Sequence, residues 1–177
     1  MNRAFCQVVR LRCLRWLAVL LLLFPLAASA DSPDVAVQLD ISKAGPRKVE
    51  SQTEGRLLGD YQLAWVNIAQ ALNSNDPSPF EGLFVGAAKK WLDESVAGQR
   101  RSGLATRYSN QTHNLRVVFY APEGDLIELH DTAEYEMQVL ASGKVIHEGH
   151  GVHRYVVLMT PGVDRWVIRQ LMEVSQF

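Results

Sequence analysis

The sequence predicts an α+β fold, in which amphipathic N-terminal helices pack on a curved antiparallel four-stranded meander. Three observations lead to this class. Apolar side chains recur at three- and four-residue steps between residues 50 and 96, which is the helical period. Beyond residue 114 the period changes to two, which is typical of strands. Short segments rich in Gly, Pro and Asp separate the apolar runs, so consecutive strands are joined by tight turns.

Residues 1–30 resemble a bacterial secretory signal. Four arginines (Arg3, Arg10, Arg12, Arg15) precede an apolar run that ends at Ala28-Ser29-Ala30, a small-x-small cleavage pattern. The run is too short to span a bilayer comfortably, since a spanning helix needs roughly 20 residues. The sequence therefore predicts a cleaved signal, with an uncleaved N-terminal anchor as the alternative. After cleavage we expect a periplasmic or secreted protein with no stable membrane insertion.

Removal of residues 1–30 leaves 147 of the 177 residues, enough for one domain with a sizeable core. The four lost arginines reduce 18 basic residues to 14 against 19 acidic ones, a net charge of −5. This mildly acidic balance argues against a nucleic-acid partner, because phosphate binding needs a concentrated basic face. Both cysteines lie within the predicted signal, so the remaining chain has no thiol for a nucleophile, disulfide or metal site.

The domain itself is predicted over residues 50–177, after a polar lead-in of residues 31–49. We expect this lead-in to be flexible, although Val35–Leu39 could add a short edge strand. One helix is predicted from Glu50 to Leu72, ended by the polar turn before Pro77. A second begins at a Ser78–Glu81 capping box and ends near Gly103. Trp65, Trp91 and Trp166 all lie on predicted core stripes.

Four strands are predicted after the helices, over residues 115–121, 126–140, 144–160 and 165–174. On the second strand, alternate residues from Ile127 to Val139 are apolar, with the exception of Asp131. A buried carboxylate is costly unless it is paired. Asp131 is therefore paired, exposed at a rim, or functional.

The partner of Asp131 depends on the register of the second hairpin. If Ser142-Gly143 is a two-residue turn, Asp131 lies opposite Arg154 and Tyr135 lies opposite His150. If the loop has three residues and a bulge, Asp131 faces His153 and every side chain of the third strand changes face. We favour the first register, because the second sets Glu136 against Glu148. In that register Gln170 continues the row from Asp131, and Trp166 belongs to an apolar wall beside it.

These residues suggest a concave, mostly apolar pocket with a few polar groups, as is usual for a small-molecule site. The candidate ligand-binding residues are Asp131, Tyr135, His150, Arg154, Trp166 and Gln170. Arg154 would hold a carboxylate or carbonyl of the ligand, and Asp131 would orient Arg154. The alternative interpretation is an Asp131–Arg154 ion pair that only stabilises the end of the sheet.

Three histidines, His147, His150 and His153, invite a metal-site interpretation. Two glycines among them make a helix improbable, and on a strand His150 points away from the other two. His147 and His153 would then lie about 20 Å apart at ~3.3 Å per residue. We therefore expect neither a metal site nor a cofactor.

Helices followed by a long, curved meander resemble the nuclear transport factor 2-like fold, a cone of sheet wrapped over helices. Between Ala88 and Val174 the pattern is most similar to the IMS domain family. The residues that carry this resemblance are Trp91-Leu92, Gly103, Ala133, Tyr155–Met159 and Trp166–Ile168. The superfamily includes small-molecule isomerases, dehydratases and hydrolases as well as non-catalytic assembly domains, so the resemblance implies a fold without choosing a function.

The leading functional expectation is a non-catalytic binding or assembly module, which recognises an envelope protein segment or a small apolar molecule in its cone. The alternative is a cofactor-free isomerase, dehydratase or hydrolase, with Asp131 as general base and His150 beside it. The third strand is apolar on both faces, which predicts a covered second surface. A homodimer through the outer sheet face, or the N-terminal segment, would cover it.

Overall fold

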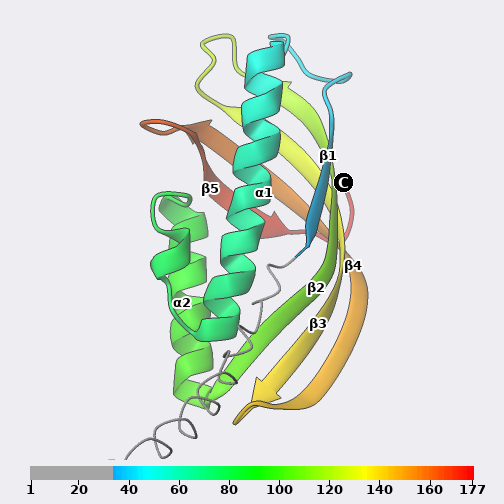
Figure 1. The fold of residues 1–177 in the computed structure, drawn as a ribbon. Coiled ribbons are helices and arrows are strands. Elements are labelled where there is room, and N and C mark those ends of the chain that lie inside the picture. Colours follow the sequence, from blue (N-terminus) through cyan, green and yellow to red (C-terminus); the bar gives the residue numbers. More distant parts are fainter. Residues whose placement is uncertain (1–33) are drawn as a thin grey trace, which may run out of the picture. The chain divides into compact units, whose positions relative to one another are not determined.

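The computed structural model describes residues 34–177. The predicted signal peptide lies outside the described residues. Five strands and two α-helices follow one another as β1 (Val35–Asp40), α1 (Ser51–Ser74), α2 (Gly86–Ser102), β2 (Leu104–Tyr120), β3 (Ile127–Ala141), β4 (Lys144–Pro161) and β5 (Trp166–Glu173). A short 3₁₀ turn, η1 (Ser78–Phe80), precedes α2. Figure 1 shows both helices on the concave side of one curved sheet.

The prediction of a four-stranded antiparallel meander is wrong, because the sheet has five strands and is mixed. The order is β1-β2-β3-β4-β5, and β1 runs parallel to β2 while the other neighbours are antiparallel. Val35–Asp40 therefore belongs to the sheet, although it lies in the segment predicted as a flexible lead-in. Its first residue is only 3% exposed, and Gln62 of α1 donates a hydrogen bond to the Val35 carbonyl.

Strand β2 also begins earlier than predicted, at Leu104. The segment before Leu115 is polar, and a bulge between Ser109 and Thr112 interrupts its alternation. Asn110 has a positive φ of 52° at this bulge. Gln111 and His113 are nevertheless buried on the concave face. A strand with inward polar residues and a shifted alternation gives no period of two in the sequence.

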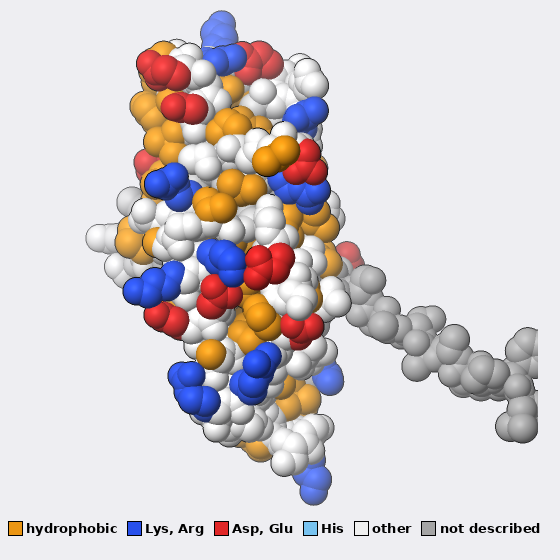
Figure 2. Space-filling view, turned by 90° about the vertical axis from the view of Figure 1, so that its left-hand side faces the viewer, with side chains coloured by type: hydrophobic (Ala, Val, Ile, Leu, Met, Phe, Trp, Pro, Cys, Tyr) orange, Lys and Arg blue, Asp and Glu red, His pale blue; other side chains and the backbone are white. Residues whose placement is uncertain are grey.

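Helix α1 buries the stripe that its sequence predicts, including Leu57, Tyr61, Trp65, Ile68 and Leu72. Helix α2 buries Ala88, Leu92 and Val96. The core position predicted for Trp91 is wrong, because its side chain is 47% exposed. Figure 2 shows one side of the molecule, where basic and acidic side chains alternate with apolar ones.

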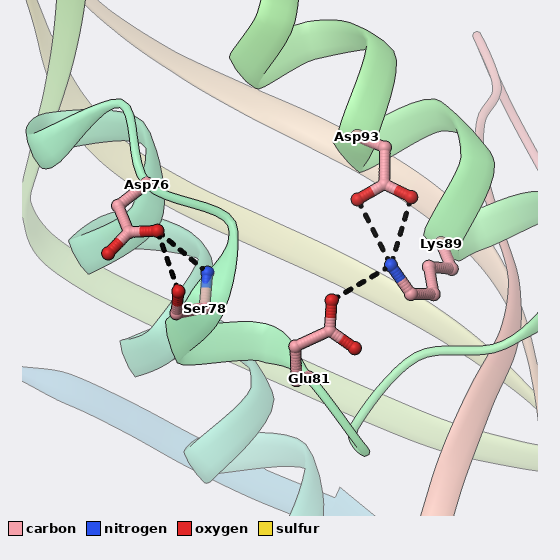
Figure 3. A network of polar contacts seen from close by, with 5 residues as sticks. All are labelled: Asp76, Ser78, Glu81, Lys89 and Asp93. Atoms are coloured by element: carbon pink, nitrogen blue, oxygen red, sulfur yellow. Dashed lines mark hydrogen bonds and ion pairs between the residues drawn. The ribbon is translucent and has the colours of Figure 1, made fainter.

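The Ser78–Glu81 capping box does not start an α-helix, because Ser78–Phe80 forms only η1 and α2 begins at Gly86. Asp76 accepts hydrogen bonds from the Ser78 backbone N–H and hydroxyl, at 3.1 and 2.8 Å. Glu81 and Asp93 both pair with the Lys89 ammonium, at 3.2 and 2.9 Å (Figure 3). The Glu81–Lys89 pair connects the end of η1 to α2. Since all the groups are partly exposed, each pair adds little to stability.

Candidate functional site

The register of β3 with β4 differs from both registers considered from sequence. The hairpin turn is the expected two-residue turn, since Ala141 pairs with Lys144. A bulge then follows, where Leu140 pairs with Val145 and Val139 with His147, so that Ile146 is the extra residue. Beyond the bulge the register has moved by one residue, and Asp131 lies opposite Tyr155. One extra residue reverses the facing of every later side chain of β4.

The predicted Asp131–Arg154 pair is therefore not formed. Arg154 pairs with Thr132 and lies on the outer face of the sheet. His150 lies on the same outer face, where its Nε2 is 3.0 Å from a Glu134 carboxylate oxygen and its side chain is 58% exposed. Hence Asp131 and His150 do not share a site.

Tyr135 and Trp166 lie on the concave side, as the sequence predicts. Gln170 pairs with Leu158 on the outer face, because a second irregularity between Leu158 and Met159 shifts β5 against β4. Met172, predicted in the apolar wall, is 45% exposed for the same reason. Trp166 packs edge-on against Tyr120, with ring centroids 6.3 Å apart.

On the concave face, Asp131 instead contacts two residues that the sequence did not suggest as its partners. The Tyr61 hydroxyl of α1 donates to Asp131 Oδ2 at 2.7 Å. His113 Nδ1 of β2 lies 2.8 Å from the same oxygen, and both side chains of this pair are 0% exposed. A helix and two neighbouring strands thus converge on one buried carboxylate. Such a group stays in a core only when hydrogen bonds replace its water.

Several polar atoms beside this carboxylate have no hydrogen-bond partner among the described residues. They are Asp131 Oδ1, His113 Nε2, Trp65 Nε1 and both side-chain polar atoms of Gln111. The Trp65 ring lies against the His113 ring, with centroids 4.4 Å apart. Buried polar groups without partners are rare in native folds, and each raises the question of function.

An aromatic series continues from this buried centre to the surface. Trp65 contacts Tyr155, whose hydroxyl shares a hydrogen bond of 2.8 Å with that of Tyr135. The Tyr135 ring stacks on His153, with centroids 4.6 Å apart and planes within 3°. His153 Nδ1 lies 2.7 Å from a Glu173 carboxylate oxygen, and its side chain is 33% exposed. The series therefore links a fully buried acid to a partly exposed histidine–glutamate pair.

Burial holds the tyrosines of this series in their protonated form. The pKa of Tyr61 is raised well above its ordinary value, first by desolvation and then by the charge of Asp131. The pKa of Tyr155 is raised by burial and by its neighbour Tyr135, and burial also raises the pKa of Tyr108 and Tyr135. All four hydroxyls therefore act as hydrogen-bonding groups at neutral pH.

Strand β4 places two glycines opposite concave-face residues of β3. Gly151 is the residue opposite Tyr135, and Gly149 is opposite Met137. A Cβ added at Gly151 would lie 3.1 Å from the His153 ring, and one at Gly149 would lie 3.6 Å from a His147 ring nitrogen. Tyr108 lies opposite Met137 on β2 and packs edge-on against Tyr135 at 5.0 Å. We refer to this feature as the concave aromatic surface, formed by Tyr108, Tyr135, Met137, Gly149, Gly151 and His153.

A separate hollow of about 390 Å³ lies at the end of the β3–β4 hairpin. It is lined by Asn73, Asn75, Gly103, Leu104, Ala105, Arg107, Leu140, Ser142 and Gly143. None of the predicted site residues belongs to it.

Within residues 34–177, no cluster of three or more His, Cys, Asp or Glu side chains could hold a metal ion. The three histidines of β4 fall on both faces of the strand, because His150 pairs with Glu136 on the outer side and His147 and His153 pair with Val139 and Ala133. In the same part of the chain, no helix is long and apolar enough to cross a membrane.

Comparison with known proteins yields a structural relation and no family. No family model and no curated protein matches the chain. Among solved structures, the fold is similar to that of the intermembrane space region of the chloroplast protein ARC6. The TM-score is 0.56 at 12% identity, and the match covers 74% of this chain and 100% of that chain.

At 12% identity this similarity shows the fold alone. It agrees, at the level of the fold, with the resemblance to the IMS domain family. Membership of the nuclear transport factor 2-like superfamily remains a prediction.

Proposed function

We propose that the chain is a non-catalytic binding or assembly module of the cell envelope, which takes a protein segment or a small apolar molecule on its concave aromatic surface. The observation that carries this proposal is the pair of glycines opposite Tyr135 and Met137. Neither glycine has a side chain to cover the residue directly opposite, so the Tyr135 ring is covered from β4 by His153 instead. Apolar surfaces of this kind, with a few polar groups at the rim, suit an apolar ligand.

Polar groups at the edge of the proposed binding surface would orient a bound ligand. The exposed side of His153 and its partner Glu173 offer one donor and one acceptor next to the apolar floor. Tyr108 and Met137 are partly buried against the core, so the floor is held by packing. A rigid floor loses little conformational entropy when a ligand binds.

Extracytoplasmic location is part of the proposal. It is supported by the secretory pattern of residues 1–30 and by the solved neighbour, which is described as an intermembrane space region. Both point to a compartment outside the cytoplasm, and neither names a partner.

Titration with the apolar fluorescent anion 1-anilinonaphthalene-8-sulfonate, followed by amide chemical shifts, tests the proposed surface. We expect the largest shifts at Tyr108, Met137, Gly149 and Gly151. Met137→Gln should weaken binding about tenfold, since the change removes apolar contact from the floor. Met172→Gln is the matched control, because Met172 is an exposed methionine on the outer face. Equal weakening by both variants, or shifts spread over the outer face, would refute the surface.

A second candidate is cofactor-free acid–base chemistry, with one specific observation in its favour. His113 is held by Asp131 through Nδ1 while its Nε2 has no partner among the described residues. A histidine oriented by a carboxylate is a common arrangement for a general base. In this form of the enzyme hypothesis Asp131 orients the base, and Tyr61 is the hydrogen-bond donor beside it.

Acylation with diethyl pyrocarbonate separates the two functions. The reagent modifies imidazole nitrogens that solvent reaches, so the exposed His150 serves as an internal standard. The binding-module proposal predicts that His113 stays unmodified after His150 has reacted. Rapid modification of His113 in the folded protein would reveal an accessible Nε2 and favour the enzyme.

A further inference from the structure

Strand β4 is paired on both sides only along its second half. Strand β5 pairs with it from Tyr155 onward, and the last contact is the Val174 N–H, which donates to the Arg154 carbonyl at 2.8 Å. Among residues 34–177, no strand pairs with the other edge of Lys144–His153. In Figure 1 this part of β4 forms the margin of the sheet.

The direction of the peptide groups along this edge follows from that last contact. In an antiparallel ladder, alternate residues direct their N–H and C=O groups to opposite sides of the strand. Because the Arg154 carbonyl points away from β3, the peptide groups of Val152, His150 and Glu148 point the same way. Those of Gly149 and Gly151 point to β3. The edge thus offers a row of backbone donors and acceptors at even-numbered residues.

Apart from the bulge at Ile146, this edge lacks the usual protection against pairing. Proline, clustered lysines and short length normally prevent edge strands from adding further strands. The stretch from Val145 to His153 contains neither Pro nor Lys. Its exposed apolar side chains are Val145, Ile146 and Val152, at 43%, 60% and 50%. A long, apolar and open edge is a site for strand addition.

We propose that a second copy of this chain occupies the edge, by antiparallel pairing of β4 with β4 about a two-fold axis at Gly149. In this register Glu148 lies opposite the partner's His150, and Ile146 opposite the partner's Val152. Because the axis is two-fold, each of these pairs occurs twice in the dimer. Glu148 and His150 direct their peptide groups outward, so their pair is a hydrogen-bonded one, and glycine meets glycine at the axis.

The neighbouring registers are less complementary. Pairing about Glu148 would place two glutamates opposite each other, which is unfavourable. Pairing about His150 would set Glu148 against the partner's Val152. Of these three registers, only the one about Gly149 joins acid to imidazole and also sets Val152 against the apolar Ile146 of the bulge. Self-complementarity of this kind is what a two-fold interface requires.

Residues of β3 already hold the Glu148 and His150 side chains on the outer face. Gln138 donates to Glu148 at 2.8 Å, and Glu134 lies 3.0 Å from His150. Dimerisation would join two five-stranded sheets into one. The interface is distinct from the outer sheet face, through which the sequence predicts a dimer. It shares Gly149 and Gly151 with the concave aromatic surface, but it uses outward backbone groups and outer-face side chains of β4.

Sedimentation velocity over about a hundredfold range of concentration tests the proposal with the chain purified after export to the periplasm of a bacterial host. We expect a reversible monomer–dimer equilibrium. His150→Glu places two glutamates opposite each other at two positions and should weaken dimerisation at least tenfold. Glu148→Arg combined with His150→Glu restores opposite charges and should restore the dimer. Gln170→Glu is the control, because it adds an acid to the outer face of β5.

A backbone variant completes the test. His150→Pro removes an outward N–H without removing a hydrogen bond to β3, so it should abolish the dimer and leave the monomer folded. A monomer at all concentrations would overturn the proposal. So would a dimer that is insensitive to His150→Pro and to the charge exchange, because it would use another surface.

Discussion

At the scale of single residues, the Asp131 carboxylate decides how the concave face is organised. It is 0% exposed and accepts hydrogen bonds from a helix residue, Tyr61, and a strand residue, His113. Hydrogen bonds to a buried charged group are stronger than those between neutral groups. Asp131 therefore joins α1 to the middle of the sheet.

Asp131→Asn should lower the free energy of unfolding by about 1–3 kcal/mol, because a neutral amide oxygen accepts the two hydrogen bonds more weakly than a carboxylate oxygen does. Urea denaturation measures the effect. In a double-mutant cycle with Tyr61→Phe, the two changes should be less than additive by about 1 kcal/mol, since both act on the same contact. Full additivity would show that the Tyr61–Asp131 hydrogen bond contributes nothing in solution.

The tyrosines give the protein a distinct response to alkaline pH. The pKa values of Tyr61 and Tyr155 are raised in the folded state, whereas unfolded tyrosine ionises near pH 10. Above this pH the unfolded state binds fewer protons than the folded state, so stability falls as pH rises. The stabilisation is fully present below about pH 10.

Between about pH 10 and 12 we expect a loss of about 1.4 kcal/mol per pH unit for each such tyrosine. Tyr155→Phe should reduce this slope by the contribution of one residue. Urea unfolding at a series of pH values measures both slopes. Parallel pH profiles for the two proteins would contradict the prediction.

At the scale of elements, the register of β4 decides which side chains share a face. The bulge at Ile146 carries Tyr155, Val157 and Met159 into the core and moves His150 and Arg154 to the outside. Val152, Val156 and Leu158 then lie on the outer face, so β4 is apolar on both faces and a dimer through the outer face stays a prediction. The same bulge places Gly149 and Gly151 beside the aromatic floor.

Strand β1 provides a test of the architecture at this scale. We expect those backbone amides of residues 36–40 that face β2 to exchange slowly with deuterium, since β1 is an edge strand whose alternate amides bond to β2. Hydrogen exchange followed by mass spectrometry measures this directly. Exchange as fast as that of an unstructured peptide would contradict the five-stranded sheet.

The sequence predicts the helices and strands better than their pairing. The stripe from Leu57 to Leu72 and the alternation from Ile127 to Val139 are visible because neither is interrupted. Bulges at Asn110 and Ile146 are not visible, because each depends on how two strands fit together. The sequence marks Asp131 as an anomaly, but its partners lie on α1 and on a part of β2 that the sequence does not predict as a strand. His113 was missed because its strand has no regular period.

At the scale of the whole molecule, one end of the concave side is fully buried and the other end is partly exposed. Asp131, His113 and Trp65 close the end beneath α1, while Met137, Tyr108 and His153 remain partly accessible at the other. The first end stabilises the fold, and the second is the surface that we propose binds a partner. This division supports a binding module over an enzyme, because the best candidate base, His113, lies at the buried end.

Native mass spectrometry of the chain purified from a periplasmic preparation tests binding at the concave aromatic surface. We expect a reproducible small-molecule or peptide adduct that is reduced in Met137→Gln and retained in Met172→Gln, the exposed methionine of the outer face. An adduct that both variants retain equally would contradict binding at this surface, and so would a protein that stays free of adducts when 1-anilinonaphthalene-8-sulfonate is added.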